Sequence, residues 1–588
     1  MTENAPHQQG ALPEPSSIED SSDVSSSTLR NWFYRVPRLL VAFGVVFFFA
    51  VFAALHLRNH RAFGSLAYDT AIYDQAVWLL GHTTNPFMTV RGLYVHGHHV
   101  NPFLYLLVPI SWLGGGAESF LLAQTACFAL GAIPVFGISR YLLAGAPIHT
   151  AHRKRFTSWL RPTTNSHAEW LAAGIALAYL ANPMIQWINW AHFHPESFAT
   201  LPFLCAWWAM LRRRWGWYGL CIIVLISTRE ETALAVTMLG LVIVWRAFTL
   251  RQGSARLKRE RKRAWQAPAH VVHRDVVTTG WTDSRYAYLP GLLTSVVGGS
   301  WYLLCTRFIL PRYNNGRPPY YLKTFFGSFG GSVGVIIRKF VTDHENIIAL
   351  ATKQDRLDYY WALGRPLGFA FLASPVHLLM IVPSMVSNIL TDSPYPRQIE
   401  YQYAAVLSGP LWIATIWSLA KLRRHPKILA LAVVAMLGTT AYAVSDFSPA
   451  PVSKRGEIYW AKPDIRSKAL RVALRLIPPN AGVSASDFVL PHLDRRKHAY
   501  LWPNPFRERY WGNYDPVAPT PLADSNNVDW FLVDDRFLEP EDGQLVDELT
   551  AQGAPFELVF NSNGVKVGRR KPGIVSPLNT NVPRVKGF

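Results

Sequence analysis

Long apolar segments separated by short polar ones constrain this chain more than any other feature. Half of the 588 residues are hydrophobic and only 16% are charged, and the hydrophobic residues occur in blocks. A block of about 20 apolar residues can cross a bilayer as a helix. The sequence therefore predicts a polytopic α-helical membrane protein with about 11 transmembrane helices, whose main partner is the lipid bilayer.

Basic residues next to these blocks indicate which loops face the cytoplasm. The expected spans are 39–57, 119–143, 170–188, 198–211, 217–226, 232–245, 288–310, 361–373, 375–390, 404–420 and 428–444. Arginines precede the first span, and basic runs at 153–161, 212–214 and 251–263 fall on the same side as the N-terminus. We expect a multi-pass cell-membrane protein with a cytoplasmic N-terminus and an extracytoplasmic C-terminus. The basic residues of 311–360 fit this topology less well.

Charge and cysteine content exclude two other classes of protein. The net charge is +20, but the basic residues flank apolar blocks and form no basic face interleaved with aromatic residues. Nucleic acid is therefore not an expected partner. The four cysteines, Cys127, Cys205, Cys221 and Cys305, fall within apolar segments and predict no disulfide framework.

Changes in composition divide the chain into four parts. The polar composition of residues 1–34 predicts a disordered cytoplasmic tail, and the apolar blocks of residues 35–448 predict the transmembrane domain. Strand-like runs at 482–490, 528–534 and 556–567 alternate with helix-like runs at 467–476 and 543–552. Residues 449–573 therefore predict a small extracytoplasmic α/β domain, followed by a tail at 574–588.

The loop at 58–117 is the first candidate for a functional site. Apolar residues recur at helical spacing around Asp69 and Asp74, which predicts a helix lying along a surface. Asp69 follows the first span closely, where a carboxylate could accept a proton from an attacking hydroxyl. The alternative is that Asp69 only caps the helix. Asp74 has two readings, a solvated position or a partner of Gln75 and Arg91.

Histidines form the second candidate site. His192, His194 and Glu196 alternate in an extended segment, so that all three could ligate zinc or another divalent metal from one face. His99 and its neighbours could join them from the first loop. The alternative is interfacial histidines followed by a Pro-Glu helix start.

Two further outer segments carry polar residues. Arg229 and Glu230 occupy a tight turn between two short spans, where ionisable groups are costly unless they are functional or reach water. Gln402 and Tyr403 close the loop before the span at 404–420, where a tyrosine can also be an interface anchor. All four candidate groups are predicted on the outer side of the membrane.

These motifs, taken in order, resemble a known family. They are YDTAIYDQA at 68–76, HHVNP at 98–102, FHPE at 193–196, REE at 229–231 and QY at 402–403. Over roughly residues 35–570 the chain resembles the bacterial membrane-protein family catalogued as domain of unknown function 2079. The layout of that family is similar to that of GT-C-type glycosyltransferases, which use polyprenyl-phosphate sugars outside the cytoplasmic membrane.

The resemblance implies a role for each candidate residue. Asp69 would be the catalytic base of an inverting glycosyltransferase. The donor and acceptor would contact the remaining polar positions, namely Asp74, Gln75, Arg91, His99, Arg229, Glu230, Gln402 and Tyr403. His192, His194 and Glu196 would hold a divalent metal if there is one, although the loop lacks the Asp-x-Asp or Asp-x-Glu pair of metal-binding members.

Three functions therefore follow from the sequence. The first is transfer of a sugar from a polyprenyl-phosphate donor to a cell-envelope acceptor, with Arg229 or Arg91 neutralising the phosphate. The second is a transporter or flippase, although the sequence contains no evident inverted repeat. The third is a non-catalytic scaffold for envelope assembly that binds through its C-terminal domain.

Overall fold

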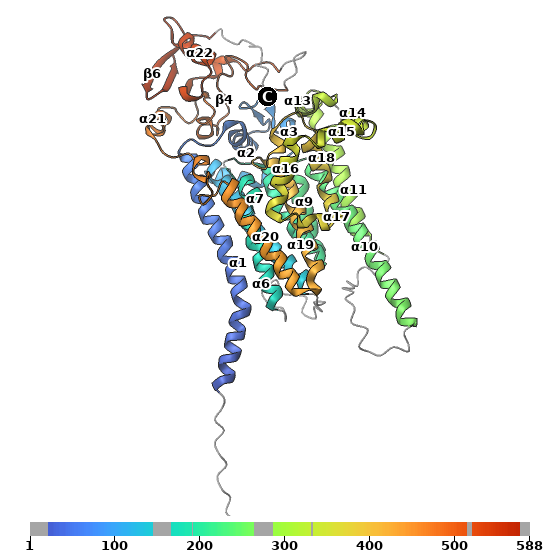
Figure 1. Ribbon diagram of the computed structural model, residues 1–588. Helices are drawn as coiled ribbons and strands as arrows, with labels where there is room; N and C mark the ends of the chain where they lie inside the picture. Colours follow the sequence, from blue (N-terminus) through green and yellow to red (C-terminus); the bar gives the residue numbers. More distant parts are fainter. Residues whose placement is uncertain are drawn as a thin grey trace, which may run out of the picture.

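The structure is a computed structural model that describes residues 21–144, 166–190, 192–263, 286–330, 333–513 and 520–576. A bundle of long helices carries a smaller sheet-containing region at one end (Figure 1). The helix α2 (Ile72–His82) lies between that region and the bundle, and we call this end of the bundle the loop end. The basic run expected at 153–161 lies outside the described residues, whereas the run at 251–263 forms the end of α10 (Thr232–Arg263).

Six helices in the described part of the chain are long and apolar enough to cross a membrane. They are Arg35–Arg61 of α1 (Ser21–Arg61), α5 (Ala117–Leu143), Thr232–Gln252 of α10 (Thr232–Arg263), Leu289–Tyr313 over α11 (Leu289–Leu304) and α12 (Leu310–Tyr313), Gln402–Arg424 around α19 (Ala405–Lys421), and α20 (Pro426–Phe447). The most apolar part of the segment around α19 is 89% buried, whereas that of Leu289–Tyr313 is only 17% buried. Water would not tolerate so much exposed apolar surface, so the peripheral helices face lipid.

Several other predicted spans form shorter or broken helices, and the count of about 11 is not confirmed. The span at 170–188 divides into α6 (Ser166–Ala181) and α7 (Pro183–Ile188), because Asn182 caps the second helix through the backbone N–H of Met184. The spans at 198–211 and 217–226 correspond to α8 (Thr200–Leu211) and α9 (Trp215–Thr228). The span at 375–390 contains α17 (Pro375–Leu378) and α18 (Val382–Leu390).

Two predictions about secondary structure are wrong. Residues 361–373 are not a continuous span, since α16 (Gln354–Gly364) ends there and Gly368 and Phe369 adopt left-handed conformations with φ of 55° and 52°. A left-handed residue interrupts the hydrogen-bond ladder of a helix. Residues 21–34 are also not disordered, because they form the beginning of α1, while residues 1–20 lie outside the described part.

The loop after α1 is a folded layer. It contains a π-helical turn, η1 (Ala67–Ala71), then α2, a hairpin of β1 (Phe87–Met88) and β2 (Leu93–Tyr94), and the short helices α3 (Val95–His98) and α4 (Val108–Trp112). Seven residues of α2 are buried, including Asp74 and Gln75. The prediction of a helix lying along a surface is therefore wrong, because the C-terminal region covers its polar face.

That C-terminal region contains a five-stranded sheet with the order β4-β3-β5-β7-β6. The strands are β3 (Val483–Ala485), β4 (Ala499–Leu501), β5 (Trp530–Asp534), β6 (Phe556–Ser562) and β7 (Val565–Arg570). β3 is parallel to β4 and β5, with Val483 opposite Ala499 and Trp530, and β7 is antiparallel to β5 and β6. The helices α21 (Ile465–Leu474) and α22 (Pro540–Thr550) complete this mixed α/β unit.

The sheet and the first loop share one hydrophobic core. Side chains of η1 and α2, such as Ala67 and Ile72, pack in the same buried cluster as Val483, Leu532 and Val567 of the sheet. Burying apolar surface is the main stabilising contribution to such a contact. The C-terminal region is therefore an integral part of the loop end.

Polar contacts fix the position of the two parts relative to each other. The side-chain amide of Gln75 donates to Thr89 Oγ1 at 2.8 Å and to the carbonyl of Arg496 at 3.1 Å. Arg91, which is fully buried, donates through Nη1 to the carbonyls of Tyr510 at 2.8 Å and Gly512 at 2.9 Å. These residues join loop and sheet.

Replacement of Arg91 by alanine tests this assignment. Arg91→Ala removes the donor to the carbonyls of Tyr510 and Gly512, and we expect a loss of about 3 kcal/mol of stability. The measurement is the thermal unfolding midpoint of the detergent-purified protein. Arg61→Ala is the matched control, because Arg61 pairs with Glu118 on the surface and should leave the midpoint nearly unchanged. Equal midpoints for the two variants would contradict the docking role.

Candidate functional site

A buried cluster of charged and imidazole side chains lies at the loop end. Its members come from η1, from the segment after α3, from η4 (Pro195–Ala199) and from the turn between α9 and α10. Its core residues are His99, Glu196, Arg229 and Glu230, and their side chains are at most 8% exposed. We call these residues, together with Asp69 and His194, the charged cluster.

Arg229 is at the centre of the charged cluster. Its Nη1 donates to Glu196 Oε1 at 2.6 Å, and its Nη2 lies 3.1 Å from His99 Nε2. A guanidinium group has no acceptor, so His99 Nε2 must accept this hydrogen bond. His99 therefore carries its proton on Nδ1, which lies 2.9 Å from Glu230 Oε1 and donates to it. Burial and the charge of Arg229 lower the pKa of His99 and keep it neutral.

Glu230 connects this arrangement to two other segments. Its Oε2 accepts the backbone N–H of Val100 at 3.0 Å, and its Oε1 accepts the hydroxyl of Tyr321 at 3.1 Å. Tyr321 belongs to α13 (Tyr320–Phe326), and its ring stacks on His99 with centroids 5.4 Å apart. These contacts satisfy the buried carboxylate and fix the orientation of the imidazole.

Asp69 is at the more open edge of the cluster. Its side chain is 23% exposed, and Oδ2 lies 3.7 Å from Nε2 of the buried His194. Burial, together with the charges of Glu196 and Asp487, raises the pKa of Asp69 to about 7, although the charge of Arg229 opposes this rise. Burial and the charge of Arg229 lower the pKa of His194 to about 3, so this imidazole is neutral. A carboxyl group with a pKa near neutrality suits proton acceptance.

The structure also decides between the two readings of Asp69. The helical turn begins after Leu66 without any side-chain cap, and Asp69 is inside the turn. The turn is capped from the sheet region instead, because Asp487 Oδ1 accepts the backbone N–H of Ala67 at 2.7 Å. The capping alternative for Asp69 is therefore wrong. The alternative reading of the second site is confirmed in part, because Pro195 begins the helical turn η4 with Glu196 in its first turn, but the carboxylate of Glu196 pairs with Arg229.

Three buried polar atoms of the charged cluster have no hydrogen-bond partner among the described residues. They are His194 Nδ1, Glu196 Oε2 and Arg229 Nε. Buried polar atoms are normally satisfied, so unsatisfied ones concentrated in one place indicate a site for water or ligand. His194 is itself held in position by Gln124, whose Oε1 accepts the backbone N–H of His194 at 3.0 Å.

The expected metal ligands do not converge. In the described part of the chain no three His, Cys, Asp or Glu side chains are placed to hold a metal ion. His194 and Glu196 face Asp69 and Arg229, whereas the ring of His192 packs against Trp190 at 5.5 Å. The residues present do not fit the divalent site, and we derive no chemistry through a metal.

The other predicted substrate-binding residues are held by contacts outside the charged cluster, but Arg91 is near enough for its charge to lower the pKa of His99. Gln75 and Arg91 join the loop to the C-terminal region. Asp74 accepts the backbone N–H of Ala117, at the start of α5, at 2.8 Å, and it lies 3.9 Å from Nε of Arg495 in the C-terminal region. Burial raises the pKa of Asp74 to about 7 as well, but its side chain is only 2% exposed. Gln402 and Tyr403 begin the helical segment before α19, where the carbonyl of Tyr403 accepts from Asn388.

Three residues at this site were missed at the level of sequence. Tyr321 lies in a segment with no distinctive motif, and Gln124 is inside an apolar span. Asp487 is within the predicted strand-like run at 482–490, which gave no sign of this contact. Of the three, only Gln124 could have been found from the sequence, because a polar residue inside an apolar span indicates a functional or structural role.

Lipid-facing helices, a folded loop layer and a buried charged cluster define a polytopic membrane protein with a candidate site at one end of its helices. The sequence matches the family described as predicted membrane protein (DUF2079) over residues 59–567. The chain belongs to this family, as the motifs predicted. A comparison with curated protein sequences finds no match.

Solved structures give more distant likenesses. ArnT from Cupriavidus metallidurans bound to undecaprenyl phosphate has a TM-score of 0.48 at 13% identity, over 92% of this chain and 98% of that chain. The apo state of ArnT from Cupriavidus metallidurans has a TM-score of 0.45 at 13% identity, over 94% of this chain and 100% of that chain. The oligosaccharyltransferase from Archaeoglobus fulgidus, tethered with an acceptor peptide, has a TM-score of 0.35 at 11% identity, over 86% of this chain and 70% of that chain. At these scores the likeness assigns no activity to this chain.

The raised pKa of Asp69 predicts a measurable pH dependence of stability. Between pH 4 and 7 the folded protein retains a proton on Asp69 that the unfolded chain has lost, so stability falls as the pH rises through this window. Asp69→Asn removes this loss, which is at most about 4 kcal/mol. We expect the unfolding midpoint of Asp69→Asn to rise relative to wild type between pH 5 and pH 8.

The exposed Glu345 supplies the control for this comparison. Glu345→Gln changes one carboxylate on α15 (His344–Ala351), outside the charged cluster, and should follow the wild-type pH curve. Parallel curves for wild type and Asp69→Asn would show that the pKa of Asp69 is not raised.

Proposed function

We propose that this protein is a membrane glycosyltransferase that transfers a sugar from a polyprenyl-phosphate donor to an envelope acceptor at the outer face of the cytoplasmic membrane. The observation that carries the proposal is Asp69, a partly exposed carboxyl group with a pKa near 7 at the edge of an otherwise buried charged cluster. The GT-C-like layout and the outer position of the loop end belong to the same proposal.

The proposed reaction is an inverting displacement at the anomeric carbon. The acceptor hydroxyl attacks this carbon while Asp69 accepts the hydroxyl proton, and a new C–O bond forms. The bond between the anomeric carbon and the phosphate oxygen breaks, and the electron pair leaves with the polyprenyl phosphate. His194, neutral and 3.7 Å from Asp69, positions the carboxylate. The unsatisfied polar atoms of Glu196 and Arg229 are available to water or to sugar hydroxyls.

Neither arginine considered for the donor phosphate is well suited to that role. Arg229 is already paired with Glu196 and lies beside Glu230 and Glu231, so the cluster carries more acidic than basic groups. Arg91 donates to carbonyls of the C-terminal region. The phosphate of the donor therefore needs a cation elsewhere at the loop end.

Asp69→Asn tests the catalytic proposal. Asparagine has nearly the same shape but cannot accept the proton, so we expect transfer to fall by about 10²- to 10⁴-fold. The measurement is glycolipid and envelope-glycan profiling of a strain that carries the variant, normalised to the amount of protein, together with turnover of polyprenyl-phosphate sugars by the purified protein.

Asp74→Asn is the matched control, because it changes a carboxyl group on the same loop that is buried and bonds to the start of α5. Its transfer activity per folded molecule should remain within a few-fold of wild type. Glycan profiles of Asp69→Asn that equal those of wild type would overturn the catalytic role and favour the scaffold or transporter.

A further inference from the structure

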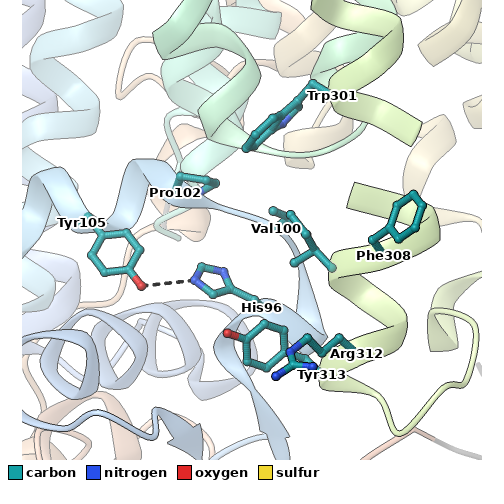
Figure 2. Close-up of a pocket in the computed structure, with 9 residues that line it drawn as sticks. His96, Val100, Pro102, Tyr105, Trp301, Phe308, Arg312 and Tyr313 are labelled. Atoms are coloured by element: carbon teal, nitrogen blue, oxygen red, sulfur yellow. Dashed lines mark hydrogen bonds between the residues drawn. The ribbon is translucent and has the colours of Figure 1, made fainter. Parts of the chain in front are cut away.

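A groove of about 390 Å³ lies between the second half of the span Leu289–Tyr313 and residues 96–105 of the first loop (Figure 2). Five of its lining residues are apolar: Val100, Pro102, Trp301, Phe308 and Ile309. Phe308 is 68% exposed on a helix that faces lipid, so the groove opens sideways toward the membrane. A groove of this composition suits a hydrocarbon chain.

Polar side chains line the other end of the groove. His96, Tyr105, Arg312 and Tyr313 gather there (Figure 2), and His96 Nε2 lies 3.3 Å from the hydroxyl of Tyr105. Arg312 follows Trp301 by eleven residues, a rise of about 16 Å along a helix. The groove therefore has an apolar stretch about 16 Å long that ends in a polar head region at the end of the span.

Arg312 has no hydrogen bond or ion pair with any described residue, and its side chain is exposed. In the same head region, the buried Nδ1 of His96 is without a hydrogen-bond partner in the described part of the chain. A cation and an unsatisfied imidazole nitrogen together suit an oxyanion that can accept hydrogen bonds. An anionic head on a long apolar chain matches both ends of the groove.

The groove and the charged cluster share a wall. The backbone N–H of Val100 donates to Glu230 of the cluster, while the side chain of Val100 lines the groove. Cys305, in the turn η6 (Cys305–Ile309) that follows α11, packs on Val100 in the same buried cluster. A lipid in the groove would therefore place its head group beside the segment that contains His99.

We propose that this groove binds the phosphate-bearing lipid of the donor, with the phosphate at Arg312 and the first part of the isoprenoid chain along Phe308 and Trp301. The identity of this lipid as the sugar carrier rests on the proposed function. Arg312 supplies the cation that neither Arg229 nor Arg91 provides. The carrier enters sideways from the membrane, and its head group reaches the loop end without leaving the bilayer.

The test is binding of undecaprenyl phosphate to the purified full-length protein in detergent, measured by native mass spectrometry. Loss of a charge-assisted contact predicts at least about tenfold weaker binding for Arg312→Gln. Arg307→Gln is the matched control, because Arg307 is exposed on the same helix but does not line the groove. Trp301→Ala should weaken binding of the lipid without changing its dependence on Arg312.

Two competitors identify the source of the phosphate. Inorganic phosphate at millimolar concentration should not displace the lipid, because it lacks the chain, and phosphatidylglycerol should compete poorly. Equal binding by Arg312→Gln and Arg307→Gln would overturn the proposal. Efficient displacement by phosphatidylglycerol would overturn it as well, because the groove would then be a general site for membrane phospholipid.

A second variant separates this proposal from the proposed function. Asp69→Asn should bind undecaprenyl phosphate as wild type does while losing transfer. If wild type binds the lipid through Arg312 but transfers no sugar, the groove assignment stands and the transferase assignment fails. If transfer depends on Asp69 but not on Arg312, the transferase stands and the groove assignment fails.

Discussion

The buried guanidinium of Arg229 is the interaction on which the loop end depends. A charge removed from water is costly unless it is paired and hydrogen-bonded. Arg229 meets this requirement only because Glu196 and His99 approach it from two other segments of the chain. The same constraint extends outward, since His99 must hold its proton on Nδ1 and so requires Glu230. One buried cation therefore determines the positions of three loops and the tautomer of one imidazole.

Asp69 and Asp74 show how environment separates two carboxyl groups of one loop. Burial raises the pKa of both to about 7. Asp74 is buried, where it accepts the backbone N–H of Ala117 at the start of α5 and lies 3.9 Å from Nε of Arg495. Asp69 is partly exposed beside the neutral His194, where an acceptor hydroxyl can approach. Accessibility, more than basicity, makes Asp69 the candidate base. The sheet region contributes to this difference, because Asp487 holds the turn that carries Asp69.

The sequence predicted what depends on local pattern. The lengths of the apolar segments predicted the long spans such as α5 and α20. The placement of basic residues led us to expect that His99, Glu196 and Arg229 lie on one side of the membrane. Contacts between distant segments could not be predicted in this way. Gln75 bonds to Arg496, which follows it by 421 residues, and Tyr321 reaches Glu230 from a segment without a motif. The metal site stays a prediction: His192 packs on Trp190, and the chain begins η4 directly after His194, so among the described residues the three expected ligands do not share one strand face.

The central claim, that Arg229 and Glu196 stabilise each other as a buried pair, is tested most directly by a double-mutant cycle. The unfolding free energies of Arg229→Met, Glu196→Gln and the double variant are compared with wild type in the same detergent. Each single change leaves a buried charge unpaired, so the double variant should be less destabilised than the sum, with a coupling of at least about 2 kcal/mol. A coupling below about 0.5 kcal/mol would be within the additivity expected of independent sites and would contradict the account.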